Sequence, residues 1–122
     1  MIAYTTIGTA DIDKAKAFYL SLLEDMGVTV FMDIGRLAAL GSPAGGPMLA
    51  VCTPYNGEAP SPGNGNMVAI SPGSRELVDK LHAKALQLGG TDEGAPGQRM
   101  DGFYGGYFRD ADGNKICFCH FG

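Results

Sequence analysis

The sequence has few basic residues and no long apolar run, and each shortage excludes a broad class of function. Its 122 residues contain 9 Lys and Arg against 13 Asp and Glu, which gives a net charge of -4 at pH 7. Nucleic-acid-binding proteins usually carry a clustered positive patch, and no such cluster occurs here. No apolar stretch approaches the roughly 20 residues that span a membrane. We therefore expect a protein that binds neither nucleic acid nor a membrane.

Cysteine is also scarce. The chain has three, Cys52, Cys117 and Cys119, and an odd number does not indicate a disulfide framework. The N-terminal residues lack the basic start and apolar core of a signal peptide, so free thiols in a reducing cytoplasm are the simplest interpretation. A bridge between Cys117 and Cys119 is the alternative, although residues two apart on an extended strand have poor geometry for a disulfide.

An internal repeat organises the chain. Each half begins with a β-rich strand, continues with a capped amphipathic helix that ends at glycine, and closes with short strands. The first half is expected to form strand 2–8, helix 11–26 and strands 28–32, 37–40 and 48–53. The second half is expected to form strand 67–70, helix 74–88 and strands 91–94, 105–109 and 115–121.

These elements predict an α+β fold of two tandem β-α-β-β-β modules. Module one covers 1–53, a linker rich in Pro, Gly and Asn covers 54–66, and module two covers 67–122. A module this small can hardly bury its own sheet face, so the two modules should pair within one domain. The expected result is a cupped mixed sheet around a cleft, with the helices outside.

The most informative segment is Tyr107-Phe-Arg-Asp-Ala-Asp-Gly-Asn-Lys-Ile-Cys117, which predicts a strand, a tight turn and a returning strand. Several short motifs precede it in a fixed order: Ile7-Gly8 before Asp11, Phe18-Tyr19, Gly63-Asn64-Gly65, the segment 88–97 and Tyr104-Gly-Gly-Tyr107. In this order they resemble the vicinal oxygen chelate superfamily (glyoxalases, bleomycin-resistance proteins, extradiol dioxygenases). The resemblance covers essentially the whole chain and implies the tandem-module fold and a homodimer.

The resemblance also defines where a metal would bind. Enzymes of this superfamily usually hold a divalent metal through histidine or glutamine on strand one, histidine on strand five and glutamate on strand eight. Those positions match Tyr4, Met67 and Cys117 here, and the two histidines, His82 and His120, occupy none of them. A soft ion such as Cu(I) is one alternative for a thiolate and thioether set. The favoured interpretation is an apolar pocket with no metal and no other cofactor.

The other reactive side chains have ordinary interpretations. His82 is expected to be a half-exposed helix residue beside the apolar face of its helix. His120 should point away from the strand face shared by Cys117 and Cys119, toward a surface or an interface. The run 110–114 resembles a calcium loop faintly, but it lacks the closing glutamate and is predicted to be a turn.

Aromatic and sulfur-containing side chains provide the candidate ligand site. Arg99 is placed to pair with a ligand carboxylate or phosphate, or alternatively to tie its loop to Asp92 or Asp101. The methionines would make such a pocket adaptable. The predicted ligand-binding residues are Tyr4, Met48, Met67, Arg99, Phe103, Tyr104, Tyr107 and Cys117.

Two functions are compatible with these residues, and no catalytic residue is assigned. The first is metal-free binding of a small, largely apolar or aromatic molecule in the sheet cleft, as in sequestration of the bleomycin-resistance type. The second is a lyase- or dioxygenase-like enzyme of the same superfamily with a non-standard or absent metal. The shortage of histidine favours binding.

Overall fold

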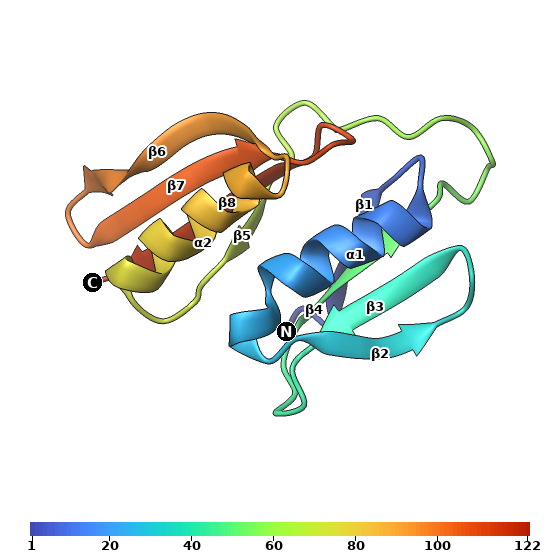
Figure 1. Cartoon of the computed structure of the whole chain (residues 1–122), viewed down its shortest axis with the longest axis horizontal. Helices are drawn as coiled ribbons and strands as arrows, with labels where there is room; N and C mark the ends of the chain where they lie inside the picture. Colours follow the sequence, from blue (N-terminus) through green and yellow to red (C-terminus); the bar gives the residue numbers. More distant parts are fainter. The chain divides into compact units, whose positions relative to one another are not determined.

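The computed structural model describes all 122 residues, which form two compact units, Met1–Pro62 and Gly63–Gly122. Each unit has one four-stranded mixed sheet and one α-helix that packs on it (Figure 1). The order of elements confirms the predicted α+β fold of two tandem β-α-β-β-β modules. The boundary between the units falls inside the segment 54–66 that the sequence suggested as a linker.

The first unit contains β1 (Tyr4–Gly8), α1 (Ile12–Leu22), a short 3-10 turn (Glu24–Met26), β2 (Thr29–Asp33), β3 (Leu37–Gly41) and β4 (Met48–Cys52). The strands lie in the order β1-β4-β3-β2, with β1 parallel to β4 and the other neighbours antiparallel. The helix predicted for 11–26 is split in the structure. α1 ends at Leu22, and a separate 3-10 turn follows at Glu24–Met26 and ends at Gly27, which adopts a φ of 72°.

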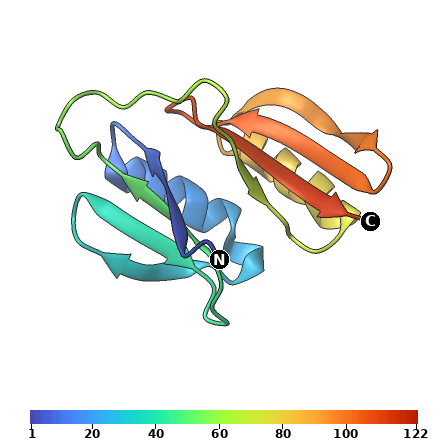
Figure 2. The ribbon, with the colours of Figure 1, turned by 180° about the vertical axis from the view of Figure 1, so that it is seen from behind.

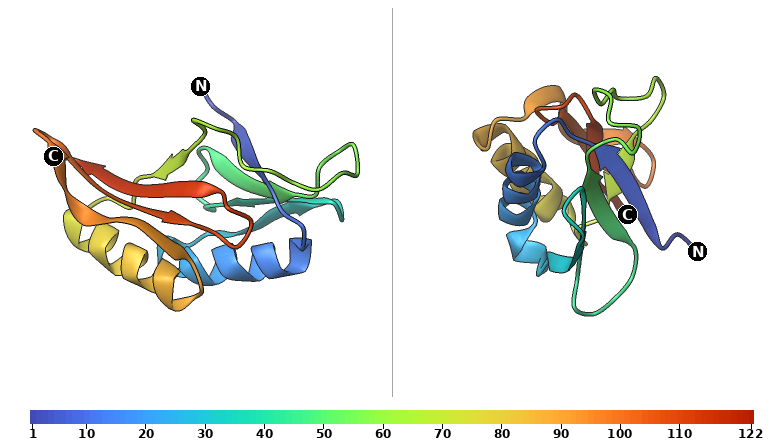
Figure 3. Two further views of the ribbon diagram at one scale, coloured as in Figure 1. Left: turned by 90° about the horizontal axis from the view of Figure 1, so that it is seen from above. Right: turned by 90° about the vertical axis from the view of Figure 1, so that its right-hand side faces the viewer.

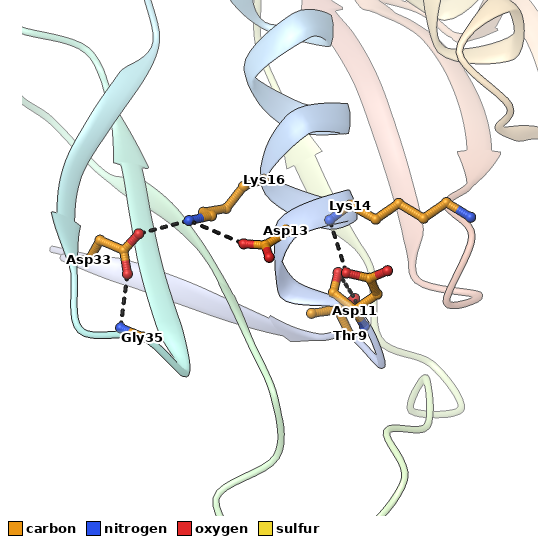
Figure 4. Close-up of polar contacts among 7 residues, drawn as sticks. All are labelled: Thr9, Asp11, Asp13, Lys14, Lys16, Asp33 and Gly35. Atoms are coloured by element: carbon orange, nitrogen blue, oxygen red, sulfur yellow. Dashed lines mark hydrogen bonds and ion pairs between the residues drawn. The ribbon is translucent and has the colours of Figure 1, made fainter.

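Polar contacts cap the start of α1 and join α1 to the end of β2 (Figure 4). The backbone amide of Lys14 donates to the Asp11 carboxylate over 3.1 Å, which caps α1 as predicted. Lys16 then joins α1 to the end of β2, since its Nζ lies 2.8 Å from Asp33 Oδ2. The hydrogen bond from Lys16 lowers the pKa of Asp33, and a second bond from the amide of Gly35 acts in the same direction.

The second unit contains β5 (Val68–Ile70), α2 (Arg75–Gln87), β6 (Thr91–Met100), β7 (Phe103–Arg109) and β8 (Lys115–Phe121). The strands lie in the order β5-β8-β7-β6, and Figure 2 shows them in front of α2. Ser74 caps α2 by accepting from the amide of Leu77 over 3.2 Å. β8 has the predicted bounds, whereas β6 is longer than predicted and its pairing with β7 is interrupted by register shifts.

Strand alternation separates the two faces of the second sheet. Figure 3 shows α2 against one side of this sheet. Phe108 pairs with Ile116 and Gly106 with Phe118, and these residues lie on the side that α2 covers, since a Cβ at Gly106 would be 3.2 Å from His82 Cδ2. The rings of Phe108 and Phe118 stack with centroids 5.8 Å apart, against the buried apolar side of the helix. Side chains at the alternate positions of β7 and β8 therefore point to the opposite face. We call that opposite face, turned away from the helix of its own unit, the distal face.

The predicted half-exposed position of His82 is wrong. Its side chain is buried on the side of α2 that faces the sheet. The Nε2 atom lies 3.0 Å from the carbonyl oxygen of Tyr107 and 3.2 Å from Asp92 Oδ1. Both partners lie on strands, outside the helix that carries His82. Together they provide hydrogen-bond partners for the buried imidazole, which helical spacing alone had placed beside the apolar face. His82 thus joins α2 to β6 and β7.

Neither α1 nor α2 combines the length and apolar character that a helix needs to cross a membrane.

Candidate functional site

The distal face of the second sheet carries four of the predicted ligand-binding side chains. Tyr107 on β7 pairs with Cys117 on β8, and Cys117 pairs in turn with Ala69 on β5. Phe103 lies on the same face of β7, and Arg99 reaches this face from β6. The structure therefore places Arg99, Phe103, Tyr107 and Cys117 on one face within one unit.

Tyr107 is the centre of this group, and two cations contact its ring. The guanidinium carbon of Arg99 lies 5.2 Å from the ring centroid, and Lys115 Nζ lies 5.4 Å from it. Cations at such distances are attracted by the negative face of an aromatic ring. Lys115 was absent from the predicted site, although it stands two positions before Cys117, so the period of a strand assigns it to the same face.

Arg99 is held by backbone carbonyl groups. Its Nε donates to the Gly105 oxygen over 3.2 Å, and its Nη2 donates to the Ala95 oxygen. The alternative prediction, that Arg99 ties the loop to Asp92 or Asp101, is therefore wrong about the partners. Carbonyl oxygens fix the guanidinium group without neutralising its charge.

Phe103 extends the aromatic surface toward the start of β7. A Cβ atom at Gly105 would lie 3.0 Å from Phe103 Cε1, so the ring of Phe103 folds closely over this glycine. Phe121 packs edge-on against Phe103 with centroids 5.1 Å apart. The distal face therefore has apolar aromatic groups next to the carbonyl group that holds Arg99.

Cys117 pairs with Tyr107 across β7 and β8, and its free thiol is fully buried. Burial is the largest cause that raises its pKa, to about 12, and Cys119 raises it further through a hydrogen bond and charge repulsion. Arg99 and Lys115 act in the opposite direction, but their effect is smaller. Because the thiolate is the nucleophilic form of cysteine, Cys117 is a poor nucleophile at neutral pH. All three cysteines of the chain are free in the structure.

Tyr104 does not belong to this face, which corrects the prediction that it lines the same cleft as Tyr107. Its hydroxyl donates to Asp79 on α2, and the Arg75 guanidinium lies 5.0 Å from its ring centroid. The bond to Asp79 raises the pKa of the phenol. Residues three apart on a regular strand point to opposite sides, so the strand period separates Tyr104 from Tyr107.

Tyr4 and Met48 meet on the distal face of the first sheet, where they are paired in register. Tyr4 is 55% exposed, whereas Met48 packs against a buried apolar cluster on that face. The cluster consists of Leu37, Ala39 and Ala50, with Met48 and Cys52 packed against it. Pro60 lies over Gly8 on the same face, because a Cβ at Gly8 would be 3.0 Å from Pro60 Cβ.

The three positions aligned with family metal ligands do not form a suitable donor set. Met67 precedes β5 and is 44% exposed, Tyr4 lies on β1, and Cys117 holds its proton at neutral pH. A thioether, a phenol and a protonated thiol are poor ligands for Zn, Mn, Fe or Ni. Across the chain, no three His, Cys, Asp or Glu side chains are grouped so that they could hold a metal ion.

Comparisons with known proteins agree with this fold. The family model of the Glyoxalase/Bleomycin resistance protein/Dioxygenase superfamily matches residues 1–118. A crystal structure of a glyoxalase/bleomycin resistance protein from Albidiferax ferrireducens T118 is 35% identical, with a TM-score of 0.89 over 100% of this chain and 99% of that chain. A search of curated proteins gave no match.

More distant solved structures show the fold alone. A glyoxalase/bleomycin resistance protein/dioxygenase family enzyme from Burkholderia phytofirmans PsJN is 20% identical, with a TM-score of 0.79 over 96% of this chain and 95% of that one. A glyoxalase-related enzyme from Fulvimarina pelagi is 21% identical, with a TM-score of 0.76 over 98% of this chain and 86% of that one.

Proposed function

We propose that this chain, which belongs to the Glyoxalase/Bleomycin resistance protein/Dioxygenase superfamily, is a metal-free protein that binds a small, largely apolar or aromatic molecule. The ligand would lie on the distal face of the second sheet. One observation carries the proposal: on this face, Arg99 and Lys115 lie over the ring of Tyr107, and the rings of Phe103 and Phe121 pack together. Apolar walls with a few polar groups are typical of small-molecule sites.

The chemistry of the same face supports binding over covalent catalysis. Cys117 is the buried nucleophile paired with Tyr107, and its pKa of about 12 keeps it protonated; the other buried thiol of this face, Cys119, pairs with Gly105. A cysteine nucleophile usually needs a histidine or another positive group that strongly lowers its pKa. His82 bonds to the far side of β7, and His120 pairs with Tyr104 on the helix-facing side of the sheet. Neither histidine is positioned to serve Cys117 as a base.

The donor chemistry supports the metal-free part of the proposal. Met67 and Cys117 are neutral sulfur groups. The superfamily's metal sites for Zn, Mn, Fe or Ni use imidazole and carboxylate ligands instead. Metal analysis after gentle purification tests this directly. About one Zn, Mn, Fe or Ni per chain, lost on substituting Cys117 or Met67, would contradict it.

Binding itself is tested by isothermal titration calorimetry with a panel of small aromatic compounds, guided by mass spectrometry of any molecule that co-purifies. Tyr107→Ala should weaken binding at least tenfold, because it removes the ring that both cations contact. Tyr55→Ala is the matched control, since Tyr55 also lies near an arginine, Arg36, but on the first unit and 90% exposed. Equal affinity of the two variants for the same compound would contradict the proposed site.

We also infer a homodimer in a reducing, cytoplasmic compartment. Several large apolar side chains are exposed on or beside β2, an edge strand of the first sheet. They are Val30, Phe31, Met32 and Ile34. An exposed apolar edge favours pairing with another chain, and we propose a second copy of this protein as the partner. The three free cysteines support the reducing compartment.

Sedimentation equilibrium tests the assembly. Wild-type protein should be dimeric at micromolar concentration, and Phe31→Lys should shift it toward monomer, whereas Tyr55→Lys should not. A wild-type monomer would contradict the dimer. A Cys117–Cys119 disulfide in protein taken from intact cells under thiol-blocking conditions would contradict the reducing compartment.

A further inference from the structure

We propose that the distal face of the second sheet selects ligands that carry a carboxylate, which binds beside Tyr107 in the positive field of Arg99 and Lys115. The inference rests on the proposed binding function and names the class of ligand: a planar, mostly apolar molecule with one carboxylate group.

The two cations come from the strands on either side of β7, Arg99 from β6 and Lys115 from β8. Arg99 bonds to the carbonyl group of Gly105, which precedes Tyr107 by two positions. Lys115 is in register with Arg109, which follows Tyr107 by two positions. Their distances from the ring centroid, 5.2 and 5.4 Å, are nearly equal. Two positive charges therefore lie close to one aromatic side chain.

A glycine allows this arrangement. A Cβ atom at Gly94 would lie 3.1 Å from Tyr107 Cδ2 and 3.3 Å from Arg99 Nη2. Any larger residue at this position would push against the ring or the guanidinium group. The backbone of β6 therefore lets the ring and the cation meet, and the carbonyl bonds to Arg99 fix its orientation before a ligand arrives. Such preorganisation reduces the entropic cost of binding.

Neither Arg99 nor Lys115 forms an ion pair with a carboxylate of the chain. Arg109 on the same sheet differs, because its Nε lies 2.6 Å from Glu93 Oε1. Lys115 lowers the pKa of Glu93 through its charge, but the close partners of the two cations are the ring of Tyr107 and, for Arg99, two carbonyl groups. A cation–ring contact is weaker than a charge-assisted hydrogen bond to a carboxylate, so an incoming carboxylate improves on the existing contacts.

The donors that remain on Arg99 suit a carboxylate. Arg99 uses Nε and one hydrogen of Nη2 on carbonyl groups, which leaves both hydrogens of Nη1 and one of Nη2 for an anion. The Lys115 ammonium adds a second positive charge near the same ring, which attracts the same anion. The aromatic surface of Phe103 and Phe121 continues from this point along the face and suits the apolar body of the ligand.

The test compares two probes of equal size, 2-naphthoate and 2-naphthamide, by isothermal titration calorimetry with the full chain. Wild-type protein should bind naphthoate about tenfold or more tightly than naphthamide. Arg99→Gln and Lys115→Gln should each reduce that preference severalfold, and the double variant should abolish it. Lys115→Arg should retain the preference. Arg36→Gln, which removes the cation near Tyr55 in the first unit, should leave it unchanged.

The outcomes separate this inference from the proposed function. Equal binding of the two probes, or a preference that survives in the double variant, would overturn carboxylate selection and leave small-molecule binding intact. If neither probe binds wild-type protein, the proposed function fails for aromatic ligands and carboxylate selection fails with it. If Arg99→Gln does not fold, Lys115→Gln alone decides, because Lys115 contacts the ring without a hydrogen bond to the backbone.

Discussion

In the first module the distal sheet face has a buried cluster of small and aliphatic side chains, whereas in the second module two cations lie beside an aromatic ring on this face. Leu37, Ala39 and Ala50 form a buried cluster on the first sheet, and Pro60 lies over Gly8 beside it. The second sheet places Tyr107 there with two cations. Both modules have the same order of elements and equivalent strand pairing. The side chains at alternating strand positions therefore decide whether such a face becomes core or a candidate binding surface.

A charge introduced into each face should give the largest difference between the modules. Ala50 on β4 is fully buried, so Ala50→Asp should lower the free energy of unfolding by about 3–5 kcal/mol, through an unpaired buried charge. Ala69 on β5 is exposed, and Ala69→Asp should cost less than about 1 kcal/mol. Urea denaturation followed by circular dichroism measures both. Ala69 lies on the edge strand β5 and Ala50 on the central strand β4, so similar losses for the two variants would contradict the difference in burial between these two positions.

Glycine substitutions should give a smaller contrast. A Cβ at Gly106 would lie 2.9 Å from the ring of Pro96 and 3.2 Å from its Cα, so Gly106→Ala should cost about 1–3 kcal/mol through overpacking. At Gly41 the Cβ would meet Met48, a flexible side chain that can move aside. Gly41→Ala should therefore cost less than Gly106→Ala in the same denaturation experiment. Because Gly106 faces α2 rather than the distal face, the reverse order would show only that Met48 is packed more rigidly than a flexible side chain.

Alkaline pH should reveal the burial of Cys117. Its folded pKa of about 12 exceeds the ordinary value of 9.0, so the folded state holds the proton more tightly than the unfolded state. The resulting stability is fully present below about pH 9 and is lost as the pH rises toward 12, by at most about 1.4 kcal/mol per pH unit. Cys117→Ala should flatten this decline in unfolding free energy. Parallel slopes for wild-type and variant proteins between pH 9 and 10.5 would contradict the assignment.

Sequence patterns were sufficient for the elements and for part of the site. Period-two alternation and the caps at Asp11 and Ser74 are local signals, and the structure has both helices where these caps place them. The same alternation, applied strictly, also separates Tyr104 from Tyr107 and adds Lys115 to the face of Cys117. These two errors came from treating nearby residues as one group without the strand period.

Other features depend on contacts that sequence spacing does not reveal. His82 is buried because Asp92 and the carbonyl group of Tyr107 reach it from β6 and β7. The length of β6 depends on its pairing with β7 across several register shifts, since a segment with Gly94, Pro96 and Gly97 has little strand propensity of its own. Arg99 bonds to carbonyl groups, which no side-chain pattern identifies.

The central claim is that the second module binds a ligand through the face around Tyr107, and backbone amide chemical shifts test it most directly. Titration of isotope-labelled protein with 2-naphthoate should shift the amide signals of Ala69, Gly105, Tyr107 and Cys117 in a saturable way, and Tyr107→Ala should abolish these shifts. Saturable shifts confined to the first module, at Ala39 and Ala50 on its distal face, would contradict the account.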